Sequence, residues 1–236
     1  MSKISVEIIV PAYNEEGNLP KLIDKLKSVR SIEPFDVLIV NNGSTDNSTR
    51  LLQSYSEQFE WLRTLNLEKN NGYGAGINSG LSFATAEIIG WTHADLQFDP
   101  NTLATAVKIA RENKGCIVKG RRVNTSFRSK ITTFGMSILA SIILNIPRVD
   151  INAQPKLLRR DFYLRNIKAH APNDFSFDLF LLWSAFKSKL EIIEVDVEFN
   201  VRYAGEAKGG GASFRKVAKI SFDAIKYMWR LRCDNF

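Results

Sequence analysis

The pattern of hydrophobic and polar positions divides residues 1–120 into alternating strand-like and helix-like segments. Residues 6–10 form a short apolar run, and apolar side chains then recur at helical spacing between Leu19 and Leu26. The same two patterns repeat further along the chain. Strands are predicted at residues 35–40, 62–67, 88–92 and 116–118, and helices after Asp46 and over residues 75–86.

Strands that alternate with helices are typical of a mostly parallel sheet with helices on both faces. The sequence therefore predicts an α/β fold of this kind, and its length does not require a second core. Ligands of such sheets bind beyond the carboxyl ends of the strands. The segments of interest are therefore residues 11–15, 41–44 and 93–97, each of which directly follows a predicted strand.

The second half of the chain has a less regular pattern. A helix is predicted over residues 175–186, a strand over 192–201 and a mobile glycine-rich loop over 205–211. A last helix is expected after Ser213, with most of its lysines and arginines opposite an apolar face. The positions expected on that apolar face are Phe214, Val217, Ala218, Ile225, Met228 and Trp229.

Composition excludes several classes of protein. The 236-residue chain is 44% hydrophobic and 24% charged, which is unlike disordered or fibrous sequences. Its two cysteines, Cys116 and Cys233, cannot build a disulfide framework and do not have the spacing of a zinc site. The first residues lack the pattern of a secretory signal, so we expect a reducing, cytoplasmic setting.

The positive charge of the chain is concentrated in its second half. Residues 1–117 carry 11 lysines and arginines against 14 acidic residues, whereas residues 118–236 carry 21 against 11. Such an excess indicates an anionic partner, for example a phosphate group, a nucleic acid or a membrane surface. The longest apolar run, residues 131–146, is shorter than the roughly 20 residues of a membrane-spanning helix. It is predicted either as a core helix or dimer surface, or as a helix that contacts lipid.

The segment from His93 to Gln97 carries the most specific chemical signal. Asp95 directly follows an apolar strand, where a carboxylate is costly unless it binds a cation or hydrogen-bond donors. The oxygen donors of Asp95 and Gln97 suit a hard divalent cation that also bridges substrate phosphates. The alternative is that Asp95 only caps the turn before Pro100. The glycines of residues 72–76 lack the spacing of a dinucleotide-binding motif, which argues against a dehydrogenase.

Three ordered segments resemble successive motifs of the family 2 glycosyltransferases, which have a GT-A fold. They are residues 10–16, 40–46 and 93–100. The most similar branch contains dolichyl-phosphate mannose synthase and the bacterial polyprenyl-phosphate glycosyltransferases. Later motifs of that branch also recur, so that the resemblance covers residues 4–208. These motifs are Gly120-Arg121-Arg122, Gln154-Pro155-Lys156-Leu157, Arg159-Arg160, and Arg202 through Gly205-Glu206 to Lys208.

The resemblance implies transfer of a sugar from a nucleotide-sugar donor, with inversion at the anomeric carbon and with Mg²⁺ or Mn²⁺ as cofactor. Position by position, it implies that Asp95 and Gln97 bind the metal. It also implies that Arg202 and Lys208 join Asp95 in catalysis by closing on the phosphate groups. The donor-binding positions that it implies are Pro11, Ala12, Tyr13, Glu15, Val40, Asn42, His93, Ala94, Asp95 and Gln97.

Two departures from the usual family pattern bear on the site. Asn41 and Asn42 stand where the family has two aspartates, and Asn42 offers a neutral amide to the ribose or base. His93 replaces the first aspartate of an Asp-Ala-Asp motif and removes one negative charge beside the metal. This predicts weaker metal binding or a preference for Mn²⁺. A catalytically inactive protein that only binds nucleotide-sugars therefore stays an alternative.

Two classes of acceptor are compatible with the sequence. A sugar hydroxyl, as in polysaccharide or O-antigen synthesis for the cell envelope, needs a general base, and Asp178 is the best candidate. A polyprenyl phosphate is already an anion and needs only basic residues to position it. Arg122, which the resemblance places near the acceptor phosphate, and Arg128 and Lys130 precede the apolar run. We expect the lipid phosphate and keep the hydroxyl as the alternative.

The expected organisation is one GT-A domain over residues 1–212, followed by a basic amphipathic helix over residues 213–236. Residues 1–120 would bind the nucleotide, and residues 121–212 would bind the acceptor. A lipid acceptor implies peripheral attachment to the cytoplasmic face of a membrane. A nucleic-acid-binding module would explain the basic half but not the acidic half or the motifs, so no nucleic acid partner is expected.

Overall fold

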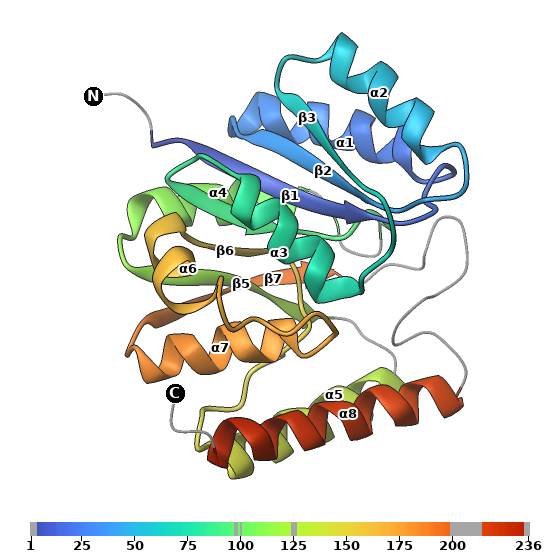
Figure 1. The fold of residues 1–236 in the computed structure, drawn as a ribbon. Coiled ribbons are helices and arrows are strands. Elements are labelled where there is room, and N and C mark those ends of the chain that lie inside the picture. Colours follow the sequence, from blue (N-terminus) through green and yellow to red (C-terminus); the bar gives the residue numbers. More distant parts are fainter. Residues whose placement is uncertain (1–3, 97–98, 100, 124–126, 199–213, 234–236) are drawn as a thin grey trace.

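The centre of the molecule is a seven-stranded sheet (Figure 1). The computed structural model describes residues 4–96, 99, 101–123, 127–198 and 214–233. Its strands are β1 (Val6–Ala12), β2 (Asp36–Asn42), β3 (Leu62–Leu67), β4 (Ile88–Trp91), β5 (Cys116–Val123), β6 (Lys156–Arg159) and β7 (Glu191–Glu198). In space they follow the order β3-β2-β1-β4-β6-β5-β7. Neighbouring strands are parallel except where β6 pairs with β4 and β5, so the predicted mostly parallel sheet is confirmed.

Helices cover both faces of this sheet, as predicted. The first hydrophobic core lies under α1 (Leu19–Ile32), α2 (Ser48–Gln58) and α4 (Thr102–Glu112). The second core lies under α3 (Tyr73–Phe83), α6 (Arg160–Asn166) and α7 (Phe177–Lys187), with α5 (Phe127–Leu144) and α8 (Phe214–Cys233) at its margin (Figure 1).

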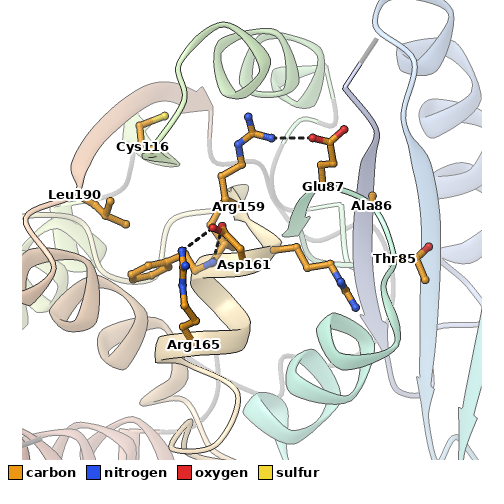
Figure 2. Close-up of a pocket in the computed structure, with 12 residues that line it drawn as sticks. Thr85, Ala86, Glu87, Cys116, Arg159, Asp161, Arg165 and Leu190 are labelled. Atoms are coloured by element: carbon orange, nitrogen blue, oxygen red, sulfur yellow. Dashed lines mark hydrogen bonds and ion pairs between the residues drawn. The ribbon is translucent and has the colours of Figure 1, made fainter. Parts of the chain in front are cut away.

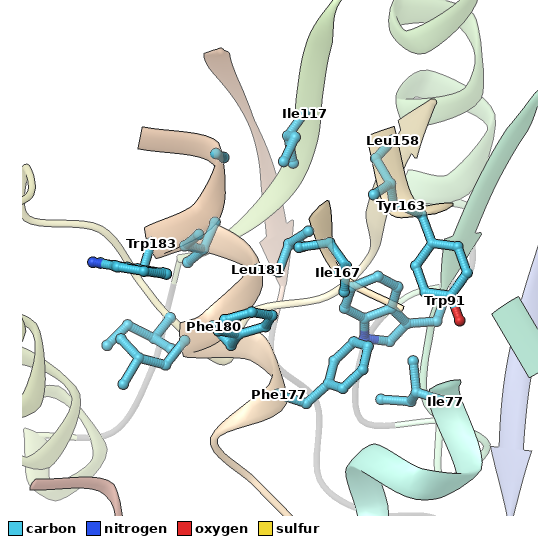
Figure 3. Close-up of a cluster of buried hydrophobic side chains, with 14 of the residues drawn as sticks. Ile77, Trp91, Ile117, Leu158, Tyr163, Ile167, Phe177, Phe180, Leu181 and Trp183 are labelled. Atoms are coloured by element: carbon cyan, nitrogen blue, oxygen red, sulfur yellow. The ribbon is translucent and has the colours of Figure 1, made fainter. Parts of the chain in front are cut away.

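Strand β1 shows why the inner strands have nearly continuous apolar sequences. Successive side chains of a strand point to opposite faces of the sheet. Ile8 and Val10 therefore enter the first core, whereas Ile9 enters the second, and all three are fully buried. A strand that serves two cores cannot alternate with polar residues. Figure 3 shows the second core, where Trp91 of β4 packs edge-on against Phe177 of α7, with ring centroids 5.4 Å apart.

The strand order changes direction beside β1. Strands β2 and β3 lie on one side of β1, and β4 lies on the other. The loops that leave the carboxyl ends of β1 and β4 therefore diverge, and the general rule for open α/β sheets places the ligand-binding crevice there. The three segments singled out from the sequence all begin at this edge of the sheet.

Several elements differ from the sequence prediction, and helices α4 and α6 were not predicted. Strand β2 continues through Asn41 and Asn42, which were predicted to form a turn. Strand β6 was not predicted, because it has only four residues and begins with the fully buried Lys156. Helix α3 begins at Tyr73, two residues before the predicted start. The predicted loop over residues 205–211 and the predicted cap Ser213 lie outside the described residues.

Helices α5 and α8 lie side by side, next to α7 and away from the sheet (Figure 1). Met228 and Leu231 of α8 are buried in the second core. The prediction that Trp229 lies on the apolar face was wrong, because the helix turns Met228 inward and leaves Trp229 52% exposed. Ala218 is also exposed. Within the described part of the chain, no helix is long and apolar enough to cross a bilayer.

Candidate functional site

The loops that follow β1 and β2 are tied together by hydrogen bonds at the carboxyl edge of the sheet. The backbone N–H of Asn14 donates to Ser44 Oγ at 3.0 Å, and the backbone N–H of Thr45 donates to Asn14 Oδ1 at 2.8 Å. Asn14 has a φ of 53°, a left-handed conformation that asparagine tolerates better than most residues. The first two segments predicted from the sequence therefore form one surface.

Glu15, predicted to bind the donor, lies at this edge but is largely buried, with 8% exposure. Its backbone N–H donates to Ser48 Oγ at 3.1 Å, and its carboxylate accepts from Asn18 Nδ2 at 2.5 Å. The side chain of Glu15 therefore fixes the start of α1. A nucleotide-sugar could contact only the small part of Glu15 that is exposed.

The other donor positions predicted after β1 and within β2 divide into accessible and buried residues. Pro11 and Tyr13 are partly exposed, so both can contact a ligand in the crevice. Ala12 and Val40 are buried in the two cores, with exposures of 1% and 0%. Pro11 pairs with Val40 in the ladder between β1 and β2. The two buried residues can shape the edge but cannot present a side chain to a ligand.

Asn41 and Asn42 have different surroundings. The Nδ2 of Asn41 donates to Thr49 Oγ1 at 2.8 Å and to Asn66 Oδ1 at 3.0 Å, so this amide holds β2 to its neighbours. Asn42 donates through Nδ2 to the carbonyl of Gly72 at 3.0 Å. Its Oδ1 is buried without a hydrogen-bond partner among the described residues. Unsatisfied buried acceptors are rare, so Asn42 Oδ1 needs a partner that the described residues do not supply, and the donor-binding role of Asn42 stays a prediction.

Close approach of α3 to Asn42 depends on glycine. A Cβ atom at Gly76 would lie 3.0 Å from Asn42 Nδ2, and a Cβ atom at Gly72 would lie 2.4 Å from the carbonyl of Asn173. Gly72 also has a φ of 108°, which disfavours other residues. These glycines let α3 begin close to the end of β2 and to the loop that contains Asn173.

His93, Ala94 and Asp95 follow the end of β4. Ala94 and Asp95 are buried, with exposures of 3% and 8%, and His93 is partly exposed. Tyr73 Oη lies 3.4 Å from His93 Nε2. Burial lowers the pKa of His93, and the charges of Lys156 and Arg122 lower it further against the opposing effect of two aspartates. The imidazole is therefore neutral at physiological pH.

Asp178, predicted as a general base, lies at the centre of a buried polar network. Its Oδ1 accepts from Lys156 Nζ at 2.6 Å and from Gln154 Nε2 at 3.2 Å. Its Oδ2 accepts from Tyr73 Oη at 3.0 Å. The side chains of Asp178 and Lys156 are 3% and 0% exposed. Both oxygens of the carboxylate therefore already accept hydrogen bonds from side chains of the protein.

The network changes the acidity of two of its members. Burial raises the pKa of Tyr73 well above its ordinary value, and the charge of Asp178 raises it further. Burial lowers the pKa of Lys156, although the adjacent Asp178 opposes this effect. Tyr73 is consequently a hydrogen-bond donor and not a phenolate, and the ammonium of Lys156 depends on Asp178 to remain charged.

Arg122, predicted near the acceptor phosphate, lies close to the end of β5. It forms a bidentate pair with Asp150, with Nε to Oδ2 and Nη2 to Oδ1 both at 2.7 Å. Burial alone would raise the pKa of Asp150, but the hydrogen bonds and charge of Arg122 outweigh it, and the pKa is lowered. Strands β4 and β5 are both antiparallel to β6, so the end of β5 that carries Arg122 lies at the same edge of the sheet as Asp95.

Several predicted residues cannot be placed. Gln97, Arg202 and Lys208 lie outside the described residues, and the structure does not describe the side chains of Arg128 and Lys130 at the start of α5. Four residues that pair with Asp178 or Arg122 were not singled out as site residues. The sequence offered a weak signal for three of them, in the 154–157 motif and in the glycine segment, and none for Asp150. They are Tyr73, Asp150, Gln154 and Lys156.

The described residues fit a divalent cation that is shared with a substrate. No group of three histidine, cysteine or acidic side chains that could hold a metal occurs among them. Mg²⁺ is often held by one or two carboxylates together with substrate phosphates and water. Asp95 supplies one carboxylate at the crevice, next to the neutral His93. The donor set therefore suits a metal that arrives with a diphosphate and not a metal caged by protein alone.

A second hollow, of about 580 Å³, lies at the opposite edge of the sheet (Figure 2). Two of its three arginines have acidic partners within the hollow. Arg159 pairs with Glu87 at 3.5 Å, and Arg165 pairs with Asp161 at 2.6 Å. It lies at the amino ends of β4, β5 and β7, away from the crevice, and we do not assign it to the candidate site.

Comparison with known proteins identifies related sequences. The sequence profile of "Glycosyl transferase family 2" matches residues 7–167. The chain is 28% identical to a dolichyl-phosphate beta-glucosyltransferase of Trichomonas vaginalis, over 99% of this chain and 78% of the relative. It is 26% identical to an undecaprenyl-phosphate 4-deoxy-4-formamido-L-arabinose transferase of Pectobacterium atrosepticum, over 94% of this chain and 66% of the relative. The chain thus spans just under two thirds of the length of this second relative.

Solved structures share the fold. Glucosyl-3-phosphoglycerate synthase from Mycobacterium tuberculosis, in complex with Mn²⁺, UDP and glucosyl-3-phosphoglycerate, superposes with a TM-score of 0.74 at 15% identity. The superposition covers 98% of this chain and 80% of that one. A mannosyltransferase from Pyrobaculum calidifontis, in complex with GDP-Man and Mn²⁺, gives a TM-score of 0.62 at 21% identity, over 87% and 59% of the two chains. The expected GT-A fold is confirmed.

Proposed function

The chain belongs to glycosyl transferase family 2, and from this premise we propose that it is an inverting, metal-dependent enzyme. We propose that it moves a sugar from a nucleotide-sugar to a lipid acceptor of the polyprenyl-phosphate type. Residues 1–120 would bind the nucleotide, and residues 121–212 would bind the acceptor. The alternatives are transfer to a saccharide hydroxyl and binding of nucleotide-sugars without turnover.

The choice of acceptor rests on the burial and the hydrogen bonds of the Asp178 carboxylate. A hydroxyl acceptor needs a general base to remove its proton, and Asp178 was the best candidate for that role. Its carboxylate already accepts hydrogen bonds from Lys156, Gln154 and Tyr73, and it is almost fully buried. A base held in this way is poorly available to a substrate. A phosphate acceptor, which is ionised before it binds, does not need one.

The relatives support the same choice. One is named for dolichyl phosphate and the other for undecaprenyl phosphate, and both are lipid phosphates. The similarity extends over 99% and 94% of this chain and is not limited to the nucleotide-binding half. Arg122, predicted to lie near the acceptor phosphate, is already paired with Asp150, so the choice of acceptor does not rest on it.

The proposed transfer is a single displacement. An oxygen of the acceptor phosphate attacks the anomeric carbon, and the bond from that carbon to the diphosphate breaks. The electron pair of the broken bond leaves with the nucleoside diphosphate, so the anomeric configuration inverts. The chain would contribute by holding the donor between the β1 and β4 loops, beside the hydrogen-bonded Tyr73 and Asp178.

Asp95 would hold the metal, with Gln97 as the second ligand that the resemblance implies. When bound, Mg²⁺ or Mn²⁺ would neutralise the negative charge that develops on the leaving diphosphate. Arg202 and Lys208 would add positive charge there. The neutral imidazole of His93 favours a softer ion than a second carboxylate would, so we propose that Mn²⁺ supports binding better than Mg²⁺.

A thermal-shift titration with UDP, GDP, CMP and dTDP, each with and without Mn²⁺, tests the donor site. A ligand at about 100 times its Kd stabilises a protein by about 2.7 kcal/mol. Each kcal/mol raises Tm by roughly 2–4 °C at this chain length. We expect a metal-dependent rise with one nucleotide and loss of that rise in Asp95→Asn. No rise with any nucleotide would contradict the proposed donor site.

The acceptor is tested with a matched pair of lipids, a short-chain polyprenyl phosphate and the same polyprenol without its phosphate. We expect sugar transfer to the phosphate and none to the alcohol or to free saccharides. Transfer to a saccharide but not to the phosphate would favour the hydroxyl alternative. Metal-dependent nucleotide-sugar binding with no transfer to any of these acceptors would favour the inactive alternative.

A further inference from the structure

The hollow at the amino ends of β4, β5 and β7 has the size of a small-molecule site (Figure 2). Its volume of about 580 Å³ falls within the range of about 300–1,000 Å³ that is typical of ligand pockets. Such pockets combine apolar walls with a few polar groups that fix the ligand. The apolar and thiol-bearing residues that line this hollow are Cys116, Leu158, Phe162 and Leu190.

Arg159 and Arg160 bring two guanidinium groups to the hollow. They form one of the motifs singled out from the sequence, and the proposed transfer reaction gives them no role. Arg159 ends β6 and Arg160 begins α6, so the step from strand to helix lets two successive side chains line the same hollow. Arg165, further along α6, adds a third guanidinium.

Arg160 forms no ion pair with an acidic side chain of the described residues. Its Nε donates to the carbonyl of Ala84 at 2.8 Å, which fixes the guanidinium in place. The N–H groups of its two terminal nitrogens have no acceptor in the described part of the chain. Because the side chain is only partly exposed, these donors are held at the hollow and are not spread into bulk water.

The acidic residues of the hollow lie toward solvent and do not balance its arginines. Arg159 is 19% exposed and lies 3.5 Å from a carboxylate oxygen of Glu87, which is 62% exposed. Arg165 pairs with Asp161, which is 64% exposed. Burial raises the pKa of the Cys116 thiol, so the thiol adds no negative charge. The lining therefore has a net positive charge, with three guanidinium groups against two carboxylates.

We propose that this hollow is a second binding site, for a small ligand that carries a phosphate or carboxylate group on a compact apolar body. Guanidinium groups bind both of these oxyanions through paired N–H donors. The apolar walls from Leu158, Phe162 and Leu190 then contact the rest of the ligand. The hollow lies at the edge of the sheet opposite the crevice, so the proposal goes beyond the transfer reaction and requires no particular donor or acceptor.

A methyl NMR titration without metal or nucleotide tests the proposal. The probes are phenyl phosphate, benzoate, inorganic phosphate and phenol, which separate the two oxyanions from each other and from the apolar body. A probe of this size reaches a Kd of about 1 mM when its groups are matched. We expect phenyl phosphate or benzoate to move the methyl resonances of Leu190, and those of Leu26 in the first core to stay unchanged. Phenol should bind about tenfold more weakly or less, because it lacks the charge.

Arginine variants assign the binding to the hollow. We expect the Kd of the oxyanion probe to rise by about tenfold or more in Arg160→Gln and in Arg159→Gln. The matched control is Arg30→Gln, because Arg30 Nε also donates to a backbone carbonyl, that of Phe35, but Arg30 does not line the hollow. This control should retain full affinity. Circular dichroism and Tm confirm that each variant is folded. Arg165→Gln, at a side chain that is 71% exposed, removes a charge of the hollow without removing a buried hydrogen bond.

Three results would overturn the proposal. The first is no movement of the Leu190 resonances at oxyanion concentrations well above the expected Kd. The second is unchanged affinity in the arginine variants of the hollow, or equal affinity for phenol. The third is binding that only Arg122→Gln abolishes, which would assign the probe to the crevice. Because metal and nucleotide are absent from these titrations, their outcome is independent of the thermal-shift and transfer experiments that test the proposed function.

Discussion

Lys156 and Asp178 are removed from water together, 2.6 Å apart, with their side chains 0% and 3% exposed. A buried ion pair adds little net stability, but loss of one partner leaves an uncompensated charge. We predict that Lys156→Met lowers the free energy of unfolding by about 3–5 kcal/mol, measured by denaturant titration. Lys156→Met/Asp178→Asn recovers part of the loss.

The exposed pair of Arg165 and Asp161 is the control for this prediction. Its atoms are 2.6 Å apart, as in the buried pair, but the side chains are 71% and 64% exposed. Water and salt screen such a pair, so Arg165→Ala should leave the unfolding midpoint nearly unchanged. Equal effects of the two single substitutions would mean that burial of Lys156 contributes nothing to the network.

Asp150 gives the stability a defined dependence on pH. The pKa of Asp150 is lowered from its ordinary value of 3.8, because Arg122 outweighs the effect of burial. The folded protein therefore binds this proton less readily than the unfolded chain. The stabilisation is present above pH 3.8 and is lost as the pH falls through the folded pKa.

We predict that Tm declines below about pH 4 and that Asp150→Asn reduces the steepness of this decline. At neutral pH the same variant is less stable than the parent, because Arg122 loses its charged partner. Differential scanning calorimetry across the acid range measures both effects. An identical acid decline in parent and variant would contradict the role of this pair.

At the scale of elements, α3 packs on β1 and β2 through Gly80. A Cβ atom at Gly80 would lie 2.5 Å from Ile9 Cγ2 and 2.7 Å from Val40 Cγ2. We predict that Gly80→Ala lowers the free energy of unfolding by about 1–3 kcal/mol through overpacking. Alanine favours a helix over glycine by about 1 kcal/mol, so this loss is the net effect.

Gly135 of α5 is the matched helical glycine, because a Cβ atom there would meet nothing within 4 Å. Gly135→Ala should therefore raise the free energy of unfolding by about 0.5–1 kcal/mol. Urea titrations of the two variants should move in opposite directions. A loss of stability in both would show that α5 is packed more tightly at Gly135 than its surroundings indicate.

The elements that could be predicted are those in which neighbouring residues decide the outcome. Strand β1 and helix α1 have strong apolar patterns, and both begin at the predicted residues, although α1 continues beyond the predicted Leu26 to Ile32. Strand β6 could not be predicted, because it begins with a lysine, which does not belong to an apolar strand pattern. Lys156 is buried beside Asp178, which lies far from it in the sequence. The side of α8 that faces the core likewise depends on its packing against α5. The apolar pattern of α8 alone does not show which side that is.

The same distinction applies to the site. Asp95 and His93 were found because they follow an apolar strand directly. Tyr73, Gln154 and Asp178 lie far apart in the chain, and their meeting depends on how α3 and α7 pack over the sheet. A pattern of residues that are neighbours in the sequence does not show which distant side chains come into contact. The edge of the sheet at which these segments meet was therefore predictable, whereas the network that occupies Asp178 was not.

At the scale of the whole molecule, α8 is held to the rest of the protein by a small buried contact. Met228 and Leu231 are 0% and 2% exposed and belong to the same core as α7. Each large apolar side chain adds about 1.5–3 kcal/mol when fully buried. We predict that Met228→Ala/Leu231→Ala detaches α8 before the sheet unfolds, which amide hydrogen exchange would detect as lost protection confined to residues 214–233.

Uniform loss of protection over the sheet and α8 would contradict this prediction. It would mean that α8 unfolds only with the whole molecule. The exposed Lys219→Ala is the control, because its side chain makes no contribution to the core and should leave exchange unchanged.

The position of β6 also has a consequence for the order in which the protein can be assembled during synthesis. Strands β3, β2, β1 and β4 are adjacent in space and are all complete once the ribosome has passed residue 91. Strand β5 is made next but does not touch β4, because β6 lies between them and is encoded only at residues 156–159. A nascent chain therefore carries a four-stranded half-sheet with an open edge at β4 until Lys156 emerges. During that interval the unpaired edge of β4 could pair with a strand of another chain. We therefore expect binding of a chaperone to prevent aggregation most at this stage of synthesis.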